Sequence, residues 1–393
     1  MRLPYPSLAV CALASVSMFA APAPTFHKDI VPVLQKRCQG CHRPGEAAPF
    51  SVLTYKDARP WAKAMKSAVI ARKMPPWSAD PSIGHFRNDP RLTQTEIDTL
   101  AAWADNGAPE GNPKDAPKPL AFLEGWNIGQ PDAVFEMPTA FTVPAKGSVD
   151  YQWVVIPTGF KEDKWIKAVE VRPGDRSVVH HVIAFYRRPG SKWLIDAVPG
   201  VPTPKGSGQP EGGMSDGSIG GYVPGLPPAI QPDGRATLLP AGSDIVLQLH
   251  YTASGKDAQD RTKVGVVFAK APVVERAAQI LLGNGKFVIP PGDANYRVDS
   301  ENVLDRDVKI VSYLAHMHLR GKAFEFTAEF PDGKVETLLK IPKYDFNWQL
   351  TYQLGEERIF PAGTKLRLSA WYDNSPNNPF NPDPKAEVRF GDQ

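Results

Sequence analysis

The chain has 393 residues, more than one ordinary hydrophobic core accommodates, so its length predicts two or three domains. The formal net charge of +3 is nearly balanced, and we expect no nucleic-acid partner and no attraction to an anionic membrane. Forty-one prolines and 32 glycines are too many for a mostly helical protein and favour short strands joined by turns.

The N-terminus has the three parts of a secretory signal peptide. Arg2 supplies a positive charge, an apolar stretch runs over residues 8–19, and small residues follow at 20–23. The apolar stretch is too short for a stable membrane span. Val10 precedes Cys11 where a lipoprotein needs a small residue. We therefore expect residues 1–23 to be a signal peptide, and the mature protein to be periplasmic or secreted.

The motif Cys38-Gln-Gly-Cys41-His42 is the attachment signature of c-type haem. In that chemistry two thioethers hold the porphyrin and the histidine is an axial ligand of the iron. A zinc ribbon would need a second cysteine pair, which the chain lacks, and a thioredoxin-like motif would need a βαβ context. The motif therefore predicts covalently bound haem c.

The surroundings of this motif have helical patterns, at residues 29–37, 55–72 and 93–104. In the last of these, Thr93 and Glu96 have the spacing of a capping box. The stretch resembles the small cytochrome c domains of bacterial periplasmic proteins. We assign residues 24–112 to a haem domain and residues 113–120 to a stiff, proline-containing linker.

The second axial ligand is predicted to be Met74, which lies in an extended loop before two prolines. Met65 is the alternative methionine, but it falls in the middle of a predicted helix. His27 and His85 are the alternatives for bis-histidine ligation.

From residue 121 onward, alternating apolar and polar residues between Pro/Gly turns predict antiparallel β-sheets. Strands are expected at residues 169–175, 265–269, 308–314, 324–330 and 364–372. Residues 190–234 are rich in Gly and Pro, and we expect a long surface loop there that could cover a site.

Five of the eight histidines fall in three β-like segments of this region: His180, His181, His250, His316 and His318. Side chains alternate along a strand, so His316 and His318 should share one face, while the adjacent His180 and His181 can bind one ion only at a strand end or bulge. Imidazole-only sites suit copper or zinc rather than magnesium or calcium. The pattern predicts two metal sites.

The order His-His, Leu-His-Tyr and His-x-His-x-x-Gly resembles the copper type II, ascorbate-dependent monooxygenases, such as peptidylglycine α-hydroxylating and dopamine β-monooxygenase. The resemblance covers roughly residue 135 to the C-terminus. It implies two jelly-roll-like β-sandwiches, residues 121–272 and 273–393, with one copper each. It also implies that the electron-storing copper binds His180, His181 and His250, and that the catalytic, oxygen-binding copper binds His316 and His318.

Two departures from that family concern the second copper and the substrate. The family adds a methionine ligand after its last strand, and we expect the given sequence to stop before that residue; Met137 and Met214 are poor substitutes. Leu314 occupies the position of an arginine that binds the substrate carboxylate in the peptide-amidating branch, so a peptidyl-glycine substrate is not expected.

The sequence thus predicts a copper-dependent monooxygenase that uses O₂ to hydroxylate a C–H bond of a small organic substrate. An ascorbate-like reductant or a redox protein would supply electrons through haem c and two copper ions. One alternative is a non-catalytic haem and copper protein for electron transfer or copper binding. Another is a structural cell-surface protein that binds haem but no stoichiometric copper.

Overall fold

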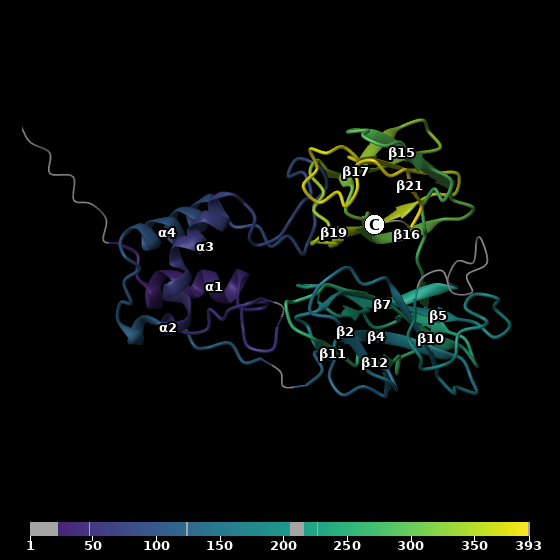
Figure 1. The fold of residues 1–393 in the computed structure, drawn as a ribbon, viewed down its shortest axis with the longest axis horizontal. Coiled ribbons are helices and arrows are strands. Elements are labelled where there is room, and N and C mark those ends of the chain that lie inside the picture. Colours follow the sequence, from purple (N-terminus) through teal and green to yellow (C-terminus); the bar gives the residue numbers. More distant parts are fainter. Residues whose placement is uncertain (1–22, 47, 123–124, 205–215, 226, 392–393) are drawn as a thin grey trace, which may run out of the picture.

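The computed structural model describes residues 23–46, 48–122, 125–204, 216–225 and 227–391. The predicted signal peptide, except Ala23, and the candidate ligand Met214 lie outside these residues. Within them the protein is mostly β-structure in several sheets, with its α-helices confined to the N-terminal part. Figure 1 shows this helical unit at one end of the molecule, beside two β regions. No helix in the described ranges is long and apolar enough to cross a membrane.

The helical unit confirms the predicted helical patterns. Its elements are η1 (Phe26–Ile30), α1 (Val31–Arg37), α2 (Tyr55–Ala58), η2 (Arg59–Trp61), α3 (Ala62–Ile70), α4 (Gln94–Asp105) and η3 (Pro113–Asp115). The capping box is present, because Thr93 Oγ1 accepts from Glu96 N at 3.2 Å and Thr93 N donates to Glu96 Oε2 at 2.8 Å. Phe26, Leu34 and Trp103 lie at the centre of the core that joins these helices.

The first β region spans residues 133–277 and packs two sheets face to face. One sheet has the order β1-β12-β4-β9-β13, with β8 added beside β4, and the other has the order β6-β3-β10-β5-β7. Their facing apolar side chains form one core. The strands are β1 (Ala133–Glu136), β2 (Phe141–Val143), β3 (Gln152–Pro157), β4 (Lys164–Arg172), β5 (Val179–Arg187), β6 (Thr203–Pro204), β7 (Gly217–Tyr222), β8 (Ala229–Ile230), β9 (Arg235–Leu239), β10 (Asp244–Tyr251), β11 (Ala258–Asp260), β12 (Lys263–Phe268) and β13 (Glu275–Ala277).

Two features of this region differ from the sequence-based expectations. The glycine-rich stretch at 217–222 is not loop: it forms β7, paired with β5. Its glycines allow close packing, since a Cβ added at Gly220 would lie 3.1 Å from Val169 Cγ1. The short strand β13 lies beyond residue 272 but joins the first region's sheet by pairing parallel with β9.

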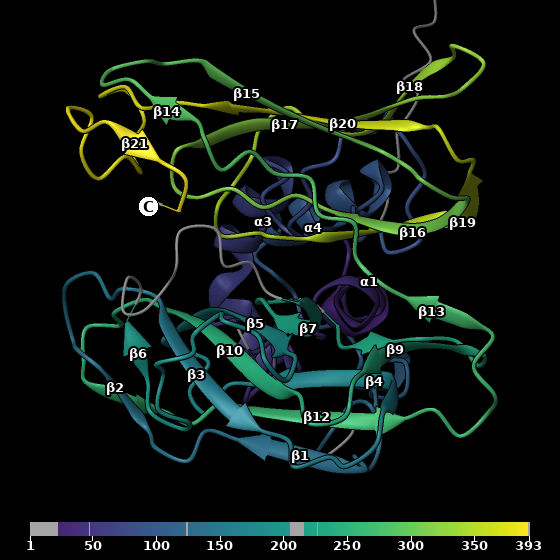
Figure 2. The ribbon, with the colours of Figure 1, turned by 90° about the vertical axis from the view of Figure 1, so that its right-hand side faces the viewer.

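The second β region, residues 288–389, is built from antiparallel strands. A four-stranded sheet, β15-β20-β17-β18, faces the pair β16-β19 across a shared core, and β14 pairs with β21. Figure 2 shows the two β regions as separate layers, with the helices behind them. The strands are β14 (Val288–Ile289), β15 (Tyr296–Val303), β16 (Val308–Leu314), β17 (Gly321–Glu329), β18 (Val335–Ile341), β19 (Thr351–Phe360), β20 (Lys365–Tyr372) and β21 (Val388–Arg389).

Residues 77–89 connect α3 to α4 but pack on the second β region. Phe86 is buried in that region's core and forms a β-bridge with Leu354 of β19. Trp77 stacks edge-on against Tyr352, with ring centroids 4.8 Å apart. This connection, which the sequence pattern did not predict, attaches the helical unit directly to β19.

Candidate metal centre

Three of the histidines come from the neighbouring strands β5 and β10. His181 pairs with His250, whereas the next pair along the ladder joins Val179 to Tyr251, so His180 is the extra residue of a β-bulge. The prediction was that both adjacent histidines can reach one site only at a strand end or a bulge, and the bulge meets this condition. The three ring centroids lie 5.0 to 5.4 Å apart. One ligand atom from each ring lies within 4.8 Å of the others, a spacing that one metal ion can bridge.

His316 and His318 do not lie in a strand, so that prediction is wrong: β16 ends at Leu314. The main chain of Met317 bonds instead to a side chain, because Met317 N donates to Tyr344 Oη at 3.0 Å and Tyr344 Oη donates to Met317 O at 2.9 Å. The side chains of residues 316–318 nevertheless alternate in direction, as they would in a strand. Met317 is buried in the second core, and the two histidine rings lie 5.2 Å apart.

The resemblance predicted one copper at His180, His181 and His250 and another at His316 and His318. These two sets of histidines lie close together between the β regions. The rings of His181 and His316 are 6.0 Å apart. Tyr151 lies between the sets, with its ring 4.7 Å from His250 and 5.8 Å from His318. We refer to His180, His181, His250, His316 and His318 together as the five-histidine cluster.

Burial and mutual repulsion lower the pKa of four histidines of the cluster and favour their neutral forms. Burial, and then repulsion from His250 and His316, holds the pKa of His181 well below its usual range. Burial, with repulsion from His180, lowers the pKa of His250 to about 3. His316 keeps an exposed surface, but the dense protein around its ring and the nearby His318 lower its pKa to about 4. Burial also lowers the pKa of His180.

Several ring nitrogens of the cluster are available to a ligand. His180 Nε2, His181 Nε2 and His250 Nδ1 are buried and have no hydrogen-bond partner among the described residues. Buried polar atoms are seldom left unsatisfied in folded proteins. Neutral imidazoles with such free nitrogens are the donors that copper and zinc require, so these residues fit the predicted metal.

Side chains around the cluster orient it, and the sequence pattern did not reveal them. Gln349 Oε1 lies 2.7 Å from His316 Nδ1, and because an amide oxygen only accepts, that nitrogen carries the proton and Nε2 keeps a free lone pair. Phe346 stacks on His180 at 4.7 Å and 8°, which shields that ring from water. Gln349, Phe346 and Tyr151 are ordinary residues in sequence, and no local motif marks them.

The predicted haem residues gather at the end of α1. His42 Nδ1 lies 3.2 Å from Phe50 O, a carbonyl acceptor, which leaves Nε2 free for an axial bond. Cys38 caps α1 and packs on the helical core, and Cys41 lies one turn further along the chain. Neither thiol forms a disulfide with a described residue, and burial raises the pKa of each. This donor set fits a c-type haem.

The candidates for the second axial ligand lie in different surroundings. Met74 is partly buried in the extended segment after α3, at a cis bond to Pro75, whereas Met65 packs on the helical core. His27 Nε2 lies 3.4 Å from a Glu110 carboxylate oxygen. His85 packs so closely over β19 that a Cβ added at Gly355 would collide with its Nδ1. His85 therefore belongs to the contact with the second β region.

A scan of the chain against protein-family models and a search among curated proteins returned no match. Of the substitute methionine ligands, Met137 is fully buried in the first β core.

Proposed function

We propose that the protein is an exported, copper-dependent monooxygenase that hydroxylates a C–H bond of a small organic substrate with O₂, using electrons supplied through haem c. The observation that supports this most is the five-histidine cluster, in which the unpaired, buried ring nitrogens of His180, His181 and His250 lie beside His316 and His318 of the second β region. The proposal includes a cytochrome c domain in the helical unit and jelly-roll-like sandwiches in the β regions.

The residues divide into two candidate copper sites. His180, His181 and His250 would hold one copper, and His316 and His318 would hold the other. Bound copper supplies one-electron redox chemistry and oxygen activation, while haem c supplies one-electron transfer. Within the described parts of the chain, the group of His180, His181 and His250 includes no carboxylate, which favours copper over magnesium or calcium, since these require oxygen ligands.

The remaining residues of the site orient ligands and exclude water. Gln349 holds the His316 ring in the tautomer that presents Nε2. Phe346 and Tyr151 cover the rings of His180 and His250, which keeps the surroundings of a bound metal apolar. Leu314, half exposed just before His316, offers an apolar surface to a substrate where the peptide-amidating branch of the resembled family carries an arginine.

In the helical unit, Cys38 and Cys41 would form the two thioethers and His42 one axial bond, with Met74 as the other ligand. The Phe50 carbonyl orients the His42 ring for this role. A stiff connection through residues 77–89 and β19 keeps this unit attached to the region that carries His316 and His318.

The test is to produce the exported protein with c-type haem maturation, load it with copper and measure both metals. We expect one covalent haem and two coppers per chain, and copper-dependent incorporation of ¹⁸O from ¹⁸O₂ into small apolar test compounds. His316→Ala should abolish incorporation, while His27→Ala in the helical unit should not. Haem and copper binding without any oxygen incorporation would favour the electron-transfer alternative. Haem without stoichiometric copper would refute both the monooxygenase and the electron-transfer alternative.

A further inference from the structure

A cavity separates the Cys38–Cys41 loop from the first β region. Its volume is about 450 Å³, and Cys41 forms part of its wall on the helical side. Tyr222, at the end of β7, and Gly225 line the opposite side. The two walls are in contact, since a Cβ added at Gly225 would lie 3.5 Å from Cys41 Sγ. The first β region therefore closes over one of the two predicted thioether positions.

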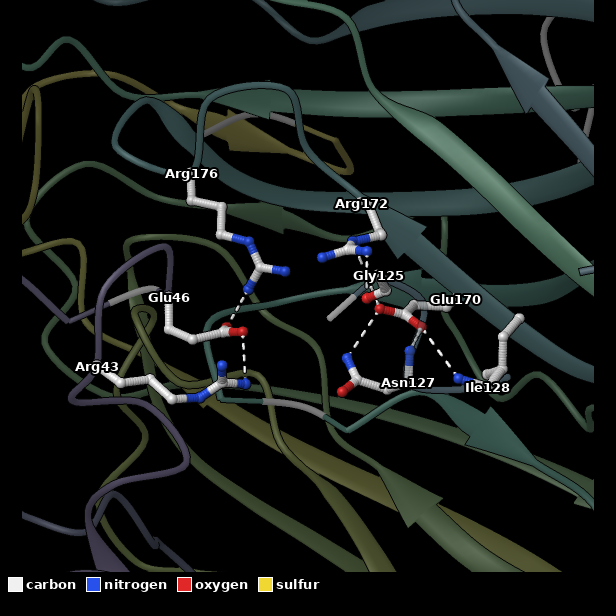
Figure 3. Close-up of polar contacts among 8 residues, drawn as sticks. All are labelled: Arg43, Glu46, Gly125, Asn127, Ile128, Glu170, Arg172 and Arg176. Carbon is white, nitrogen blue, oxygen red and sulfur yellow. Dashed lines mark hydrogen bonds and ion pairs between the residues drawn. The ribbon is translucent and has the colours of Figure 1, made fainter. Parts of the chain in front are cut away.

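An ion-pair network, Arg43–Glu46–Arg176, joins the walls of this cavity. Figure 3 shows the Glu46 carboxylate between the two guanidinium groups. Arg43 and Glu46 belong to the loop that follows the haem motif, whereas Arg176 precedes β5. The three side chains are only 15 to 18% exposed. Because they are shielded from solvent, their charges act on nearby groups more strongly than surface charges would.

A second network holds another part of the wall rigid. The Glu170 carboxylate of β4 accepts from Asn127 N at 2.6 Å, from Asn127 Nδ2 at 2.9 Å and from Ile128 N at 3.3 Å (Figure 3). These bonds fix the chain that arrives from the helical unit against the first β region. Glu170 is itself buried, so this wall does not rearrange easily.

Two polar atoms at the cavity have no partner. Tyr222 Oη and Arg43 Nε are buried and make no hydrogen bond within the described part of the chain, and Tyr222 is only 6% exposed. A buried hydroxyl and a buried guanidinium nitrogen that make no bond to the described residues are available to a group bound in a cavity of this size. A haem joined to Cys41 would place its thioether edge in this cavity.

We propose that the first β region forms part of the haem site, with Arg176 and Tyr222 enclosing the Cys41 edge and the Arg43–Glu46–Arg176 network setting the haem potential. This rests on the proposed attachment of haem to Cys38 and Cys41. The arrangement places the haem wall next to the metal centre: Arg176 lies four residues before His180, and Tyr222 pairs in the sheet with Val182, which follows His181.

The test is a potentiometric titration of the haem in the full-length, haem-loaded protein, followed by its visible spectrum. A positive charge nearby favours the reduced haem, which carries one positive charge less. Arg176→Gln should therefore lower the midpoint potential, and Glu46→Gln should raise it. Arg176→Lys should preserve it. Arg188→Gln is the matched control, because Arg188 lies beyond the opposite end of β5 and should leave the potential unchanged.

The outcomes separate this inference from the proposed function. Opposite shifts for Arg176→Gln and Glu46→Gln support it, and a general folding defect would not produce two signs. Covalent haem whose potential is the same in Arg176→Gln, Glu46→Gln and the wild type would overturn the inference and leave the proposed function standing. If no haem is attached to correctly exported protein, as shown by haem staining of a denaturing gel, both fall.

Discussion

His250 should make the copper-free protein sensitive to acid. Burial lowers its pKa to about 3, whereas the unfolded chain has the usual value of 6.5. Because the folded pKa is depressed, the folded state binds fewer protons than the unfolded state between these values, and stability falls as pH drops below 6.5. The loss is about 1.4 kcal/mol per pH unit, or about 2.7 kcal/mol two units below the usual pKa.

The experiment compares wild type with His250→Gln, which removes the titrating group from a position only 9% exposed. The free energy of unfolding of the copper-free, haem-loaded protein is measured with denaturant at about pH 7 and at about pH 4.5. The lower value is about two units below the unfolded pKa of histidine, so the expected difference in this free energy is large enough to measure. Wild type should lose about 2.7 kcal/mol more than the variant on acidification. His27→Gln, in the helical unit, should behave as wild type does. Equal losses in wild type and His250→Gln would refute the argument.

Three further predictions concern the metal centre and the attachment of the helical unit. Gln349→Ala should weaken copper binding at His316 and His318 by about 10- to 100-fold, measured by chelator competition, with unchanged affinity at the three-histidine set. Two bound Cu(II) ions should broaden each other's EPR signals, because the histidine sets meet; two unperturbed signals would contradict the observed closeness. Gly355→Ala should destabilise the protein by about 1 kcal/mol, since its Cβ would force the exposed His85 ring to move, whereas Gly285→Ala, with open space around it, should not.

Local patterns in the sequence predicted the secondary structure well where one physical rule dominated. The Thr93–Glu96 capping box begins α4 as expected, because a cap depends on residues three positions apart. Strand alternation indicated that His180 and His181 could share one site only at a strand end or a bulge, and the structure has a bulge there. The loop expected from the Gly and Pro content was wrong at residues 217–222, which form β7. The glycines fit there because neighbouring residues leave no room for a Cβ at their positions. Residue propensities predict a loop for such a stretch, and the strand forms because of its packing against the neighbouring strands.

The sequence by itself determined which residues are candidate ligands for metal or haem, because ligand chemistry belongs to the residue type and its local spacing. Only the tertiary structure decided how these residues are combined. The histidine sets of two β regions form one cluster, Gln349 and Phe346 contact it, and Arg176 pairs with Glu46 at the cavity that Cys41 also lines. These contacts link residues tens to more than a hundred positions apart. Such contacts depend on the register of the strands and on how the cores pack, and no local sequence pattern encodes either.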